Sequence, residues 1–504
     1  MLLFVLGIVL LVLGYFTYGA FVEKILAPDD RRTPAERLYD GIDYVPLPHW
    51  KNMLIQLLNI AGVGPVIGVI AGIKFGSIVF LLIPIGNIIG GATHDFISGM
   101  ASLRNNGGNL PVFIRGTLGD VAYRLFSVLM VFLLLLVVAV FINIPATLVN
   151  DYFCPNLSFF WWAVAIIFLY YVVATIFPVD KIIGSLYPFF GALLICGSLG
   201  LLGVLIFKGI QTPSIFSESA TFTQSKEGFL VDHPILPCLF VTIACGILSG
   251  FHATQSPIIA RTMKTERQAR SSFYGMMIME GIIAMIWAAG ALYLYNLKPE
   301  LWSCSPTKVL TEITTYNLGA WMGGVTIAAV IILAVTSGDT AMRCLRLSLA
   351  EAFKINQKPL LNRFAICLPL ILIVAGVLWW SNLDAESFGK LWNYFAWGNQ
   401  TLAVFTLGAG TVWLYSLKKQ GWISAIPGLF MTFIVVSFIL WTSEEHKGPI
   451  GAGLDLKLSY ILGAIFALLY MGWCVIRGVK YSKTSSLKFG EPASLENTPD
   501  NVDN

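Results

Sequence analysis

The sequence predicts an all-α integral membrane protein with about thirteen transmembrane helices. Of its 504 residues, 57% are hydrophobic and 12% are charged, and the mean hydropathy is +0.76. Soluble globular domains carry roughly twice this share of charged residues, so the composition excludes an ordinary soluble protein. Two further observations support the prediction. Apolar runs of about 20 residues recur along the chain, and the basic residues gather in alternate loops.

The N-terminal run, residues 1–22, is predicted to be a retained membrane helix. No Lys or Arg precedes it, and no small-residue cleavage site followed by a polar segment ends it, which disfavours a signal peptide. The thirteen predicted spans lie near 2–21, 54–73, 77–100, 122–144, 159–178, 184–207, 235–260, 272–296, 320–342, 363–381, 391–416, 423–442 and 458–477.

The distribution of basic residues predicts the orientation of these spans. If the N-terminus lies outside, three quarters of the 32 Lys and Arg residues fall on the cytoplasmic side, as the positive-inside rule expects. One span more or fewer in the middle of the chain would move every later loop to the other side of the membrane and remove this excess of basic residues on the cytoplasmic side. We therefore expect the N-terminus outside and the C-terminus in the cytoplasm.

The ten central spans divide as five plus five. Because five is odd, the second group crosses the membrane in the opposite sense, so two groups that share a fold form an inverted repeat. The predicted segments are an N-terminal helix at 1–22, a cytoplasmic connector at 23–53, a first five-helix repeat at 54–208, an extracytoplasmic loop at 209–234, a second five-helix repeat at 235–417, two peripheral helices at 418–480 and a disordered cytoplasmic tail at 481–504.

The first helix of each repeat is predicted to be broken in mid-span. The breaks are expected at Asn59–Pro65 and at Ser249–Pro257, because both segments combine small or polar residues with a proline that cannot donate a backbone hydrogen bond. Lipid cannot satisfy the freed backbone groups. Paired breaks at corresponding places in two halves are typical of the binding site of a secondary transporter.

The first break offers mainly backbone groups. Gly62 and Gly64 permit an unwound chain whose amides face the gap, where a solute can bind. Close helix packing through small residues explains the same pattern.

The second break offers side chains at membrane depth, where polar groups are costly unless they face water, a ligand or each other. Its His252 is a candidate to hold a carboxylate or to pass a proton, although a neutral histidine satisfied by neighbouring backbone explains it too. The tenth core helix adds an aromatic cluster with two amides, which forms either a cavity wall or an interfacial belt. The candidate substrate-binding residues are Gly62, Gly64, Ser249, Gly250, His252, Thr254, Gln255, Asn399 and Gln400.

Four titratable residues within the spans are candidates for proton coupling: His94, Asp95, Glu280 and Asp339. Glu280 is the most central, and no basic residue lies within one turn of it. Asp95 lies near the inner end of its helix, where water can reach it. Asp339 has Arg343 one turn on, so a structural ion pair explains its presence as well.

The eighth core helix carries a candidate sodium site. Leu333, Thr336 and Ser337 share one face and offer a carbonyl and two hydroxyls. With carbonyls from the first break, they supply enough oxygens for a small hard cation. Hydroxyls that bond back to their own helix are the alternative.

Enzyme signatures are missing from the sequence, which contains no phosphate loop, nucleophile elbow, HExxH or CxxC motif. The eight cysteines show no metal-ligand or disulfide spacing. No cofactor is predicted apart from Na⁺ as a candidate coupling ion, and the basic residues serve topology, so no nucleic-acid partner is expected.

Five short motifs resemble the carbon starvation protein A (CstA) family of prokaryotic transporters. They are Gly41-Ile42-Asp43-Tyr44-Val45-Pro46, Ile60-Ala61-Gly62-Val63-Gly64-Pro65, His94-Asp95-Phe96, Ser249-Gly250-Phe251-His252-Ala253 and Asn399-Gln400-Thr401-Leu402-Ala403. The resemblance covers about residues 2–480. After the His-Ala pair, this chain reads Thr254-Gln255-Ser256-Pro257 and departs from the longer members of the family.

The resemblance implies ion-driven uptake of peptides or pyruvate across a prokaryotic inner membrane, associated with carbon or nutrient starvation. It also implies a core similar to the LeuT fold, in agreement with the five-plus-five division. Under that likeness, the sodium site would comprise Ala61, Gly64, Leu333, Thr336 and Ser337.

The predicted function is therefore ion-coupled import of a small carboxylate-bearing nutrient, a peptide or pyruvate, with H⁺ or Na⁺ as the coupling ion. Two rivals remain. A membrane-embedded nutrient sensor would bind the same solutes without moving them, and a membrane enzyme is disfavoured by the missing motifs. The sequence leaves the oligomeric state open.

Overall fold

The computed structural model describes residues 2–41, 44–155, 159–176, 180–353, 355–356, 359–443 and 451–484. Within these ranges the regular structure is helical, with one isolated β-bridge between Arg32 and Thr265. Two parts of the sequence-based prediction, the Ile42-Asp43 pair of the first family motif and the tail beyond residue 484, lie outside the described residues.

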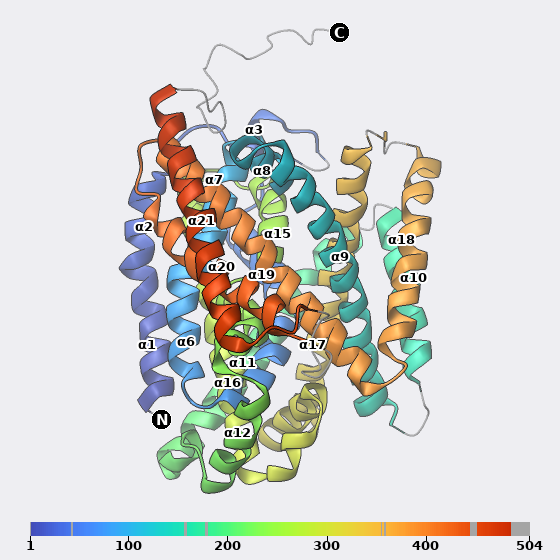
Figure 1. The fold of residues 1–504 in the computed structure, drawn as a ribbon. Coiled ribbons are helices and arrows are strands. Elements are labelled where there is room, and N and C mark those ends of the chain that lie inside the picture. The colour runs from blue at the N-terminus through green and yellow to red at the C-terminus, as the bar shows by residue number, and fades with distance from the viewer. Residues whose placement is uncertain are drawn as a thin grey trace.

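The α-helical segments are numbered α1 to α21 along the chain (Figure 1). Those of the first half are α1 (Leu2–Phe16), α2 (Tyr18–Leu26), α3 (Pro34–Arg37), α4 (His49–Ile60), α5 (Val69–Gly72), α6 (Val79–Gly86), α7 (Ala92–Leu103), α8 (Leu110–Leu118), α9 (Asp120–Leu148), α10 (Phe160–Ile176) and α11 (Asp180–Gln211). Those of the second half are α12 (Ala220–Asp232), α13 (Phe240–Thr242), α14 (Ala244–Ile247), α15 (Gly250–Ala260), α16 (Met276–Leu297), α17 (Pro306–Ala352), α18 (Leu360–Ser381), α19 (Ala385–Ser416), α20 (Trp422–Trp441) and α21 (Leu456–Thr484).

The protein is an all-α multi-pass membrane protein. Among the described residues, nine helices are long and apolar enough to cross a membrane, and the bent pair His49–Ile60 and Gly64–Phe75 makes a tenth. The other three predicted spans are helical but do not meet the same test. The apolar helix Phe160–Ala174 is short, the segment near 235–260 is divided among α13, α14 and α15, and the amides Asn399 and Gln400 interrupt the apolar run of α19.

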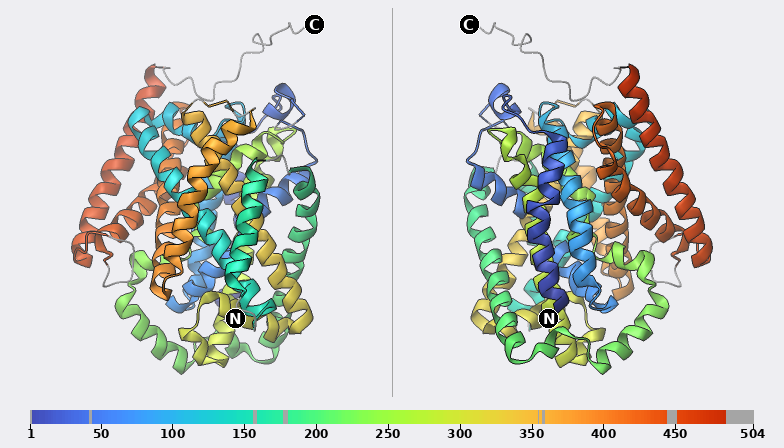
Figure 2. Two further views of the ribbon diagram at one scale, coloured as in Figure 1. Left: turned by 90° about the vertical axis from the view of Figure 1, so that its right-hand side faces the viewer. Right: turned by 90° about the vertical axis from the view of Figure 1, so that its left-hand side faces the viewer.

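The helix α16 lies at the centre of the molecule, and α1 and α21 lie at its edge. In the apolar stretch that contains α16, 83% of the residues are buried, against 28% for the stretches of α1 and α21. Figure 2 shows α21 along one edge in both views. The helices α3 and α8 lie at one end of the molecule, together with the C-terminal end of α21, and α12 lies at the other end (Figure 1). Because the α3–α8 end carries the basic loops, it is called the basic end below.

A network of ion pairs closes the basic end. The side chain of Glu266 is 1% exposed, and its Oε2 lies 3.1 Å from Nη2 of Arg104, which is 5% exposed. Arg31 Nε lies 3.6 Å from Glu266 Oε1, and the amide of Asp29 donates to Oε2. Arg104 also donates to the carbonyl of Ala27. The network ties the connector before α4 to the end of α7 and to the loop after α15.

Removal of the Glu266 carboxylate is expected to destabilise the protein strongly. Breaking a buried ion pair leaves an uncompensated charge, at a cost of about 3–5 kcal/mol, so Glu266→Ala should lower the melting temperature of the detergent-solubilised protein. Asp30→Ala is the matched control, because Asp30 and its partner Arg267 are 72% and 63% exposed and exposed pairs contribute little. Equal melting temperatures for the two variants would show that the Glu266 network does not stabilise the basic end.

Candidate functional site

The first break lies where the sequence predicts it. The helix α4 ends at Ile60, and the chain resumes as a π-helical turn, Gly64–Gly68, that leads into α5. The two helical parts are bent by 54°. Every residue from Ile60 to Ile70 is buried, so the interrupted backbone lies inside the protein and not in lipid, as the cost of unsatisfied backbone groups requires.

The second break lies earlier than predicted. The backbone leaves the helical conformation at Ile243 and again at Leu248 and Ser249, which are extended. From Gly250 to Ala260 the chain is the continuous helix α15, with Pro257 inside it. The prediction that Ser249–Pro257 itself is unwound is therefore wrong, because a proline late in this short helix leaves its other backbone bonds in place.

An amide from a distant helix caps the start of α15. Asn399 of α19 accepts hydrogen bonds at Oδ1 from the amide of Phe251 at 2.8 Å and from the hydroxyl of Ser249 at 3.1 Å. These bonds satisfy one of the free amides that open every helix. A methyl group on Gly250 would overlap the backbone of α19 at Asn399 and Ala403, so only glycine lets the two helices approach so closely.

The two breaks meet in space. A methyl group on Gly64 would overlap the side chain of Cys245, which lies in α14 between the two irregular points of the second break. One turn further on, a methyl group on Gly68 would lie 2.9 Å from the carbonyl of Thr242. The first helices of the two predicted repeats are therefore in direct contact at their interruptions.

Beside the second break, four titratable side chains form a chain of contacts, called the His–Asp–Glu cluster below. His94 Nδ1 lies 2.8 Å from Asp95 Oδ1, and His252 Nδ1 lies 3.0 Å from Asp95 Oδ2. On the other side of the His252 ring, Nε2 lies 3.6 Å from Glu280 Oε2. All four side chains are at most 1% exposed. The structure thus joins residues from α7, α15 and α16 that the sequence identifies one by one.

The geometry of the cluster suits the storage of a proton. The imidazole of His252 lies between two carboxylates, and a protonated imidazole can donate from both nitrogens. Among the described residues, both Glu280 oxygens and His94 Nε2 are buried without a hydrogen-bond partner. A proton added to or taken from this group therefore changes the hydrogen bonds within it. Asp95 is fully buried, which corrects the expectation that water reaches it directly.

The predicted sodium ligands lie beside the first break. The hydroxyl of Ser337 in α17 donates to the carbonyl of Leu58 at 3.3 Å, and a methyl group on Gly62 would lie 3.7 Å from this hydroxyl. The Thr336 hydroxyl donates to the carbonyl of Leu333 in its own helix at 2.9 Å. The face of α17 that carries Leu333, Thr336 and Ser337 therefore packs where α4 ends.

The remaining candidate side chains bond within the protein. Thr254 donates to the carbonyl of Phe251 at 2.7 Å, Gln255 donates to Thr254 Oγ1 at 3.0 Å, and Gln400 donates to the carbonyl of Phe240. Asp339 Oδ2 lies 3.6 Å from Arg343 Nη2 and accepts from Tyr170. Asp339 therefore contacts a residue of its own helix and one of α10.

Two serines lie beside the cluster. Ser98 was not singled out from the sequence, and Ser256 was noted only as one of the polar residues of the predicted second break. Ser98 Oγ lies 2.8 Å from Ser256 Oγ, and each serine lies one helical turn after a member of the cluster, Asp95 or His252. The spacings of three and four residues place each pair on one helix face. This spacing is the only signal in the sequence that connects Ser98 and Ser256 with the cluster.

The chain matches a known family along most of its length. Residues 1–162, 153–303 and 300–437 match the family described as carbon starvation protein CstA. An uncharacterized membrane protein of Haemophilus influenzae is 39% identical over 59% of this chain and 92% of its own length. The peptide transporter CstA of Bacillus subtilis is 26% identical over 93% of this chain and 94% of its own length.

Solved transporter structures share the fold. A manganese transporter of Eremococcus coleocola, solved with an aromatic bis-isothiourea compound, is 16% identical, with a TM-score of 0.52 over 89% of this chain and 99% of its own. A Na⁺-coupled sialic acid symporter is 12% identical, with a TM-score of 0.51 over 94% of this chain and 97% of its own. At these identities the likeness concerns the fold, that of LeuT-like secondary transporters. The sequence match over residues 1–437 shows that the chain belongs to the carbon starvation protein CstA family, a family of transporters and not of enzymes.

Proposed function

We propose that the protein is an ion-coupled secondary active transporter that imports a small carboxylate-bearing nutrient, a peptide or pyruvate, when carbon or other nutrients are scarce. The observation that carries the proposal is the contact between two interrupted helices, where Gly64 lies against Cys245. Substrate sites of secondary transporters form where two such helices meet. The family match supports a transport function, and the peptide transporters among the relatives support the solute class.

The proposed architecture comprises thirteen spans, with the first and last two flanking a LeuT-like core of two inverted five-helix repeats. In each repeat the first helix is the interrupted one. The protein would lie in the inner membrane of a prokaryote, with its N-terminus outside and the basic end in the cytoplasm. The arginines of the helices at that end, Arg37 in α3 and Arg115 in α8, support this orientation.

The proposed contact for the solute carboxylate is the interrupted backbone itself. Free amides at helix starts attract anions, and the first break around Gly62 and Gly64 offers little besides backbone. His252 is the less suitable partner, because both of its ring nitrogens already face carboxylates, those of Asp95 and Glu280. Of the two roles considered for His252, the geometry favours the passing of a proton.

Two groups of residues are candidates for the coupling site. The His–Asp–Glu cluster would take up a proton, and the face of α17 beside the first break would hold Na⁺ through Ala61, Gly64, Leu333, Thr336 and Ser337. The arrangement of the cluster favours the proton. Its buried carboxylates have an imidazole between them, whereas the hydroxyls of Thr336 and Ser337 already donate to protein carbonyls.

Uptake into proteoliposomes under an imposed ion gradient tests the proposal. Labelled pyruvate and labelled short peptides are offered separately, each with an inward proton gradient, an inward sodium gradient or none. We expect accumulation of one solute class driven by the proton gradient. The absence of gradient-driven accumulation of either class would contradict the proposed function.

The double variant Thr336→Ala/Ser337→Ala separates the two coupling ions. If protons drive uptake, its initial rate under a proton gradient should remain within about twofold of that of the wild type, because each hydroxyl contributes only an internal hydrogen bond. A wild type that follows the sodium gradient, with a double variant that loses this dependence, would instead assign the coupling to the α17 site.

A further inference from the structure

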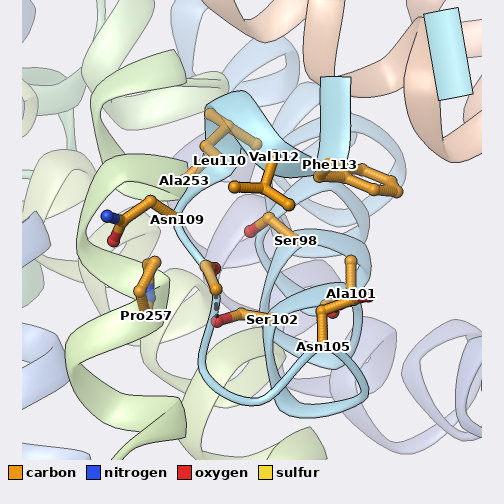
Figure 3. A pocket seen from close by; sticks show the side chains of 11 residues that line it. Ser98, Ala101, Ser102, Asn105, Asn109, Leu110, Val112, Phe113, Ala253 and Pro257 are labelled. Carbon is orange, nitrogen blue, oxygen red and sulfur yellow. Dashed lines mark hydrogen bonds between the residues drawn. The ribbon is translucent and has the colours of Figure 1, made fainter. Parts of the chain in front are cut away.

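A narrow hollow opens at the basic end, between α7, α8 and α15 (Figure 3). Its volume is about 250 Å³ when the space open to solvent is included, and its interior has room for about one water molecule. Four of the residues that line it are polar: Ser98, Ser102, Asn105 and Asn109. The hollow is thus too small for a peptide and polar enough for ordered water.

The hollow points along a polar stripe of α7 to the His–Asp–Glu cluster. Asp95, Ser98 and Ser102 follow one another at spacings of three and four residues and continue to Asn105 just after the helix, so they share one face. Ser98, Ser102 and Asn105 line the hollow, and Asp95 is the next position inward. On the facing helix α15, Ala253 and Pro257 line the hollow, and His252 lies immediately beside Ala253.

Two hydroxyls join α7 and α15 beside the hollow, which Ser98 lines. Ser98 and Ser256 hydrogen-bond to each other across the α7–α15 contact at 2.8 Å. The Ser98 hydroxyl also lies 3.0 Å from the carbonyl of Asp95, and the Ser256 hydroxyl lies 3.3 Å from that of His252. Both side chains are at most 3% exposed. Because their bonds go to each other and to backbone carbonyls, no described hydrogen bond links the hollow to the carboxylate of Asp95.

We infer that the hollow is the path by which protons pass between the His–Asp–Glu cluster and the cytoplasm, and that the Ser98–Ser256 hydrogen bond is its gate. The inference rests on proton coupling in the proposed function. When α15 separates from α7, the hydroxyl pair breaks and water from the hollow reaches Asp95 and His252. The cluster then passes its proton to this water. Its imidazole and carboxylates can afterwards take up another proton.

The gate is tested with the full-length protein in proteoliposomes that contain a pH-sensitive dye. Loss of one hydrogen bond shifts an equilibrium by about 2- to 10-fold. We therefore expect Ser98→Ala/Ser256→Ala to speed the decay of an imposed pH gradient in the absence of solute by this factor. Accumulation of labelled solute should fall accordingly, whereas exchange of solute for solute, which needs no net proton release, should proceed at the wild-type rate.

Three control variants separate the loss of the Ser98–Ser256 hydrogen bond from other effects of substitution near the hollow. Thr117→Ala should behave as wild type, because Thr117 lies in α8 outside the lining of the hollow and its hydroxyl donates to the carbonyl of Phe113 in its own helix at 2.7 Å. Ser256→Thr keeps a hydroxyl at this position, so the imposed pH gradient should decay as slowly as with the wild type. Ala101→Leu fills the hollow from α7 without touching the hydroxyl pair, and it should slow proton-driven uptake while sparing exchange.

Two results would overturn the gate. A wild type driven by protons, combined with a double variant whose leak and accumulation are unchanged, would overturn the gate alone and leave the proposed function in place. A wild type that transports without any dependence on the proton gradient would overturn the proton coupling and the gate together. If the double variant does not fold, full proton-driven uptake by Ala101→Leu would overturn the proposed path.

Discussion

The His252→Ala variant is expected to lose gradient-driven uptake by at least about 100-fold, the scale on which a positioned proton-transfer group contributes. The imidazole of His252 is the link between Asp95 and Glu280. Without it the two carboxylates remain buried with no group between them, so a proton taken up by one cannot pass to the other. Uptake of the labelled solute under a proton gradient measures the loss.

Two comparisons separate this role from a structural one. His49→Ala removes a histidine outside the cluster, whose Nε2 lies 2.7 Å from the hydroxyl of Ser271, and this variant should retain uptake. Glu280→Gln keeps the shape of the side chain but removes its charge, so it should lose gradient-driven uptake and keep solute exchange. Full uptake by folded His252→Ala protein would contradict the proposed role of the cluster.

The Gly64→Ala variant is expected to be destabilised by about 1–3 kcal/mol or more, the usual cost of overpacking a filled interior. The added methyl group would overlap both side-chain atoms of Cys245, and the Cα of that residue lies 4.0 Å away. Removal of the Cys245 side chain therefore creates the space that the methyl group needs. The double variant Gly64→Ala/Cys245→Gly should recover much of the lost stability.

Thermal unfolding in detergent is measured for the wild type, for Gly64→Ala, for Cys245→Gly and for the double variant. The four melting temperatures show whether the effects of the two substitutions depend on each other. Cys245→Gly alone is the control, because it reports the cost of the extra backbone freedom. If the effects of the two single changes simply add, with no recovery in the double variant, the two breaks do not meet at these residues. Gly228→Ala in α12 is a second control, because a methyl group there would meet no atom within 4 Å among the described residues.

The first break could be predicted from the sequence because its cause is local. Gly62, Gly64 and Pro65 weaken the helix where they stand, and the chain bends at Ala61–Val63. The second break could not be placed in the same way. Its polar residues and Pro257 suggested an unwound segment, but the helix begins at Gly250 because Asn399, about 150 residues away, caps it. A contact so distant in the sequence leaves no local pattern.

The candidate coupling residues show the same division. The positions of Asp95, His252 and Glu280 within apolar spans indicate a function one residue at a time. That they form one cluster depends on how α7, α15 and α16 pack against one another. The local sequence of each helix does not give this packing. Conversely, Asp339 and Arg343 lie four residues apart in one helix, and the ion pair that this spacing suggested as the alternative explanation for Asp339 is present.

Trans-stimulated exchange in proteoliposomes tests the central claim most directly, namely that the meeting point of the two interrupted helices moves a solute across the membrane. Vesicles loaded with unlabelled pyruvate or unlabelled short peptide are placed in a trace of the same labelled compound, with no ion gradient. A transporter should show a transient accumulation of label for one of the two solute classes, and Gly64→Ala should abolish it. Binding of the solute to detergent-solubilised protein without any such accumulation would contradict the claim and identify a sensor.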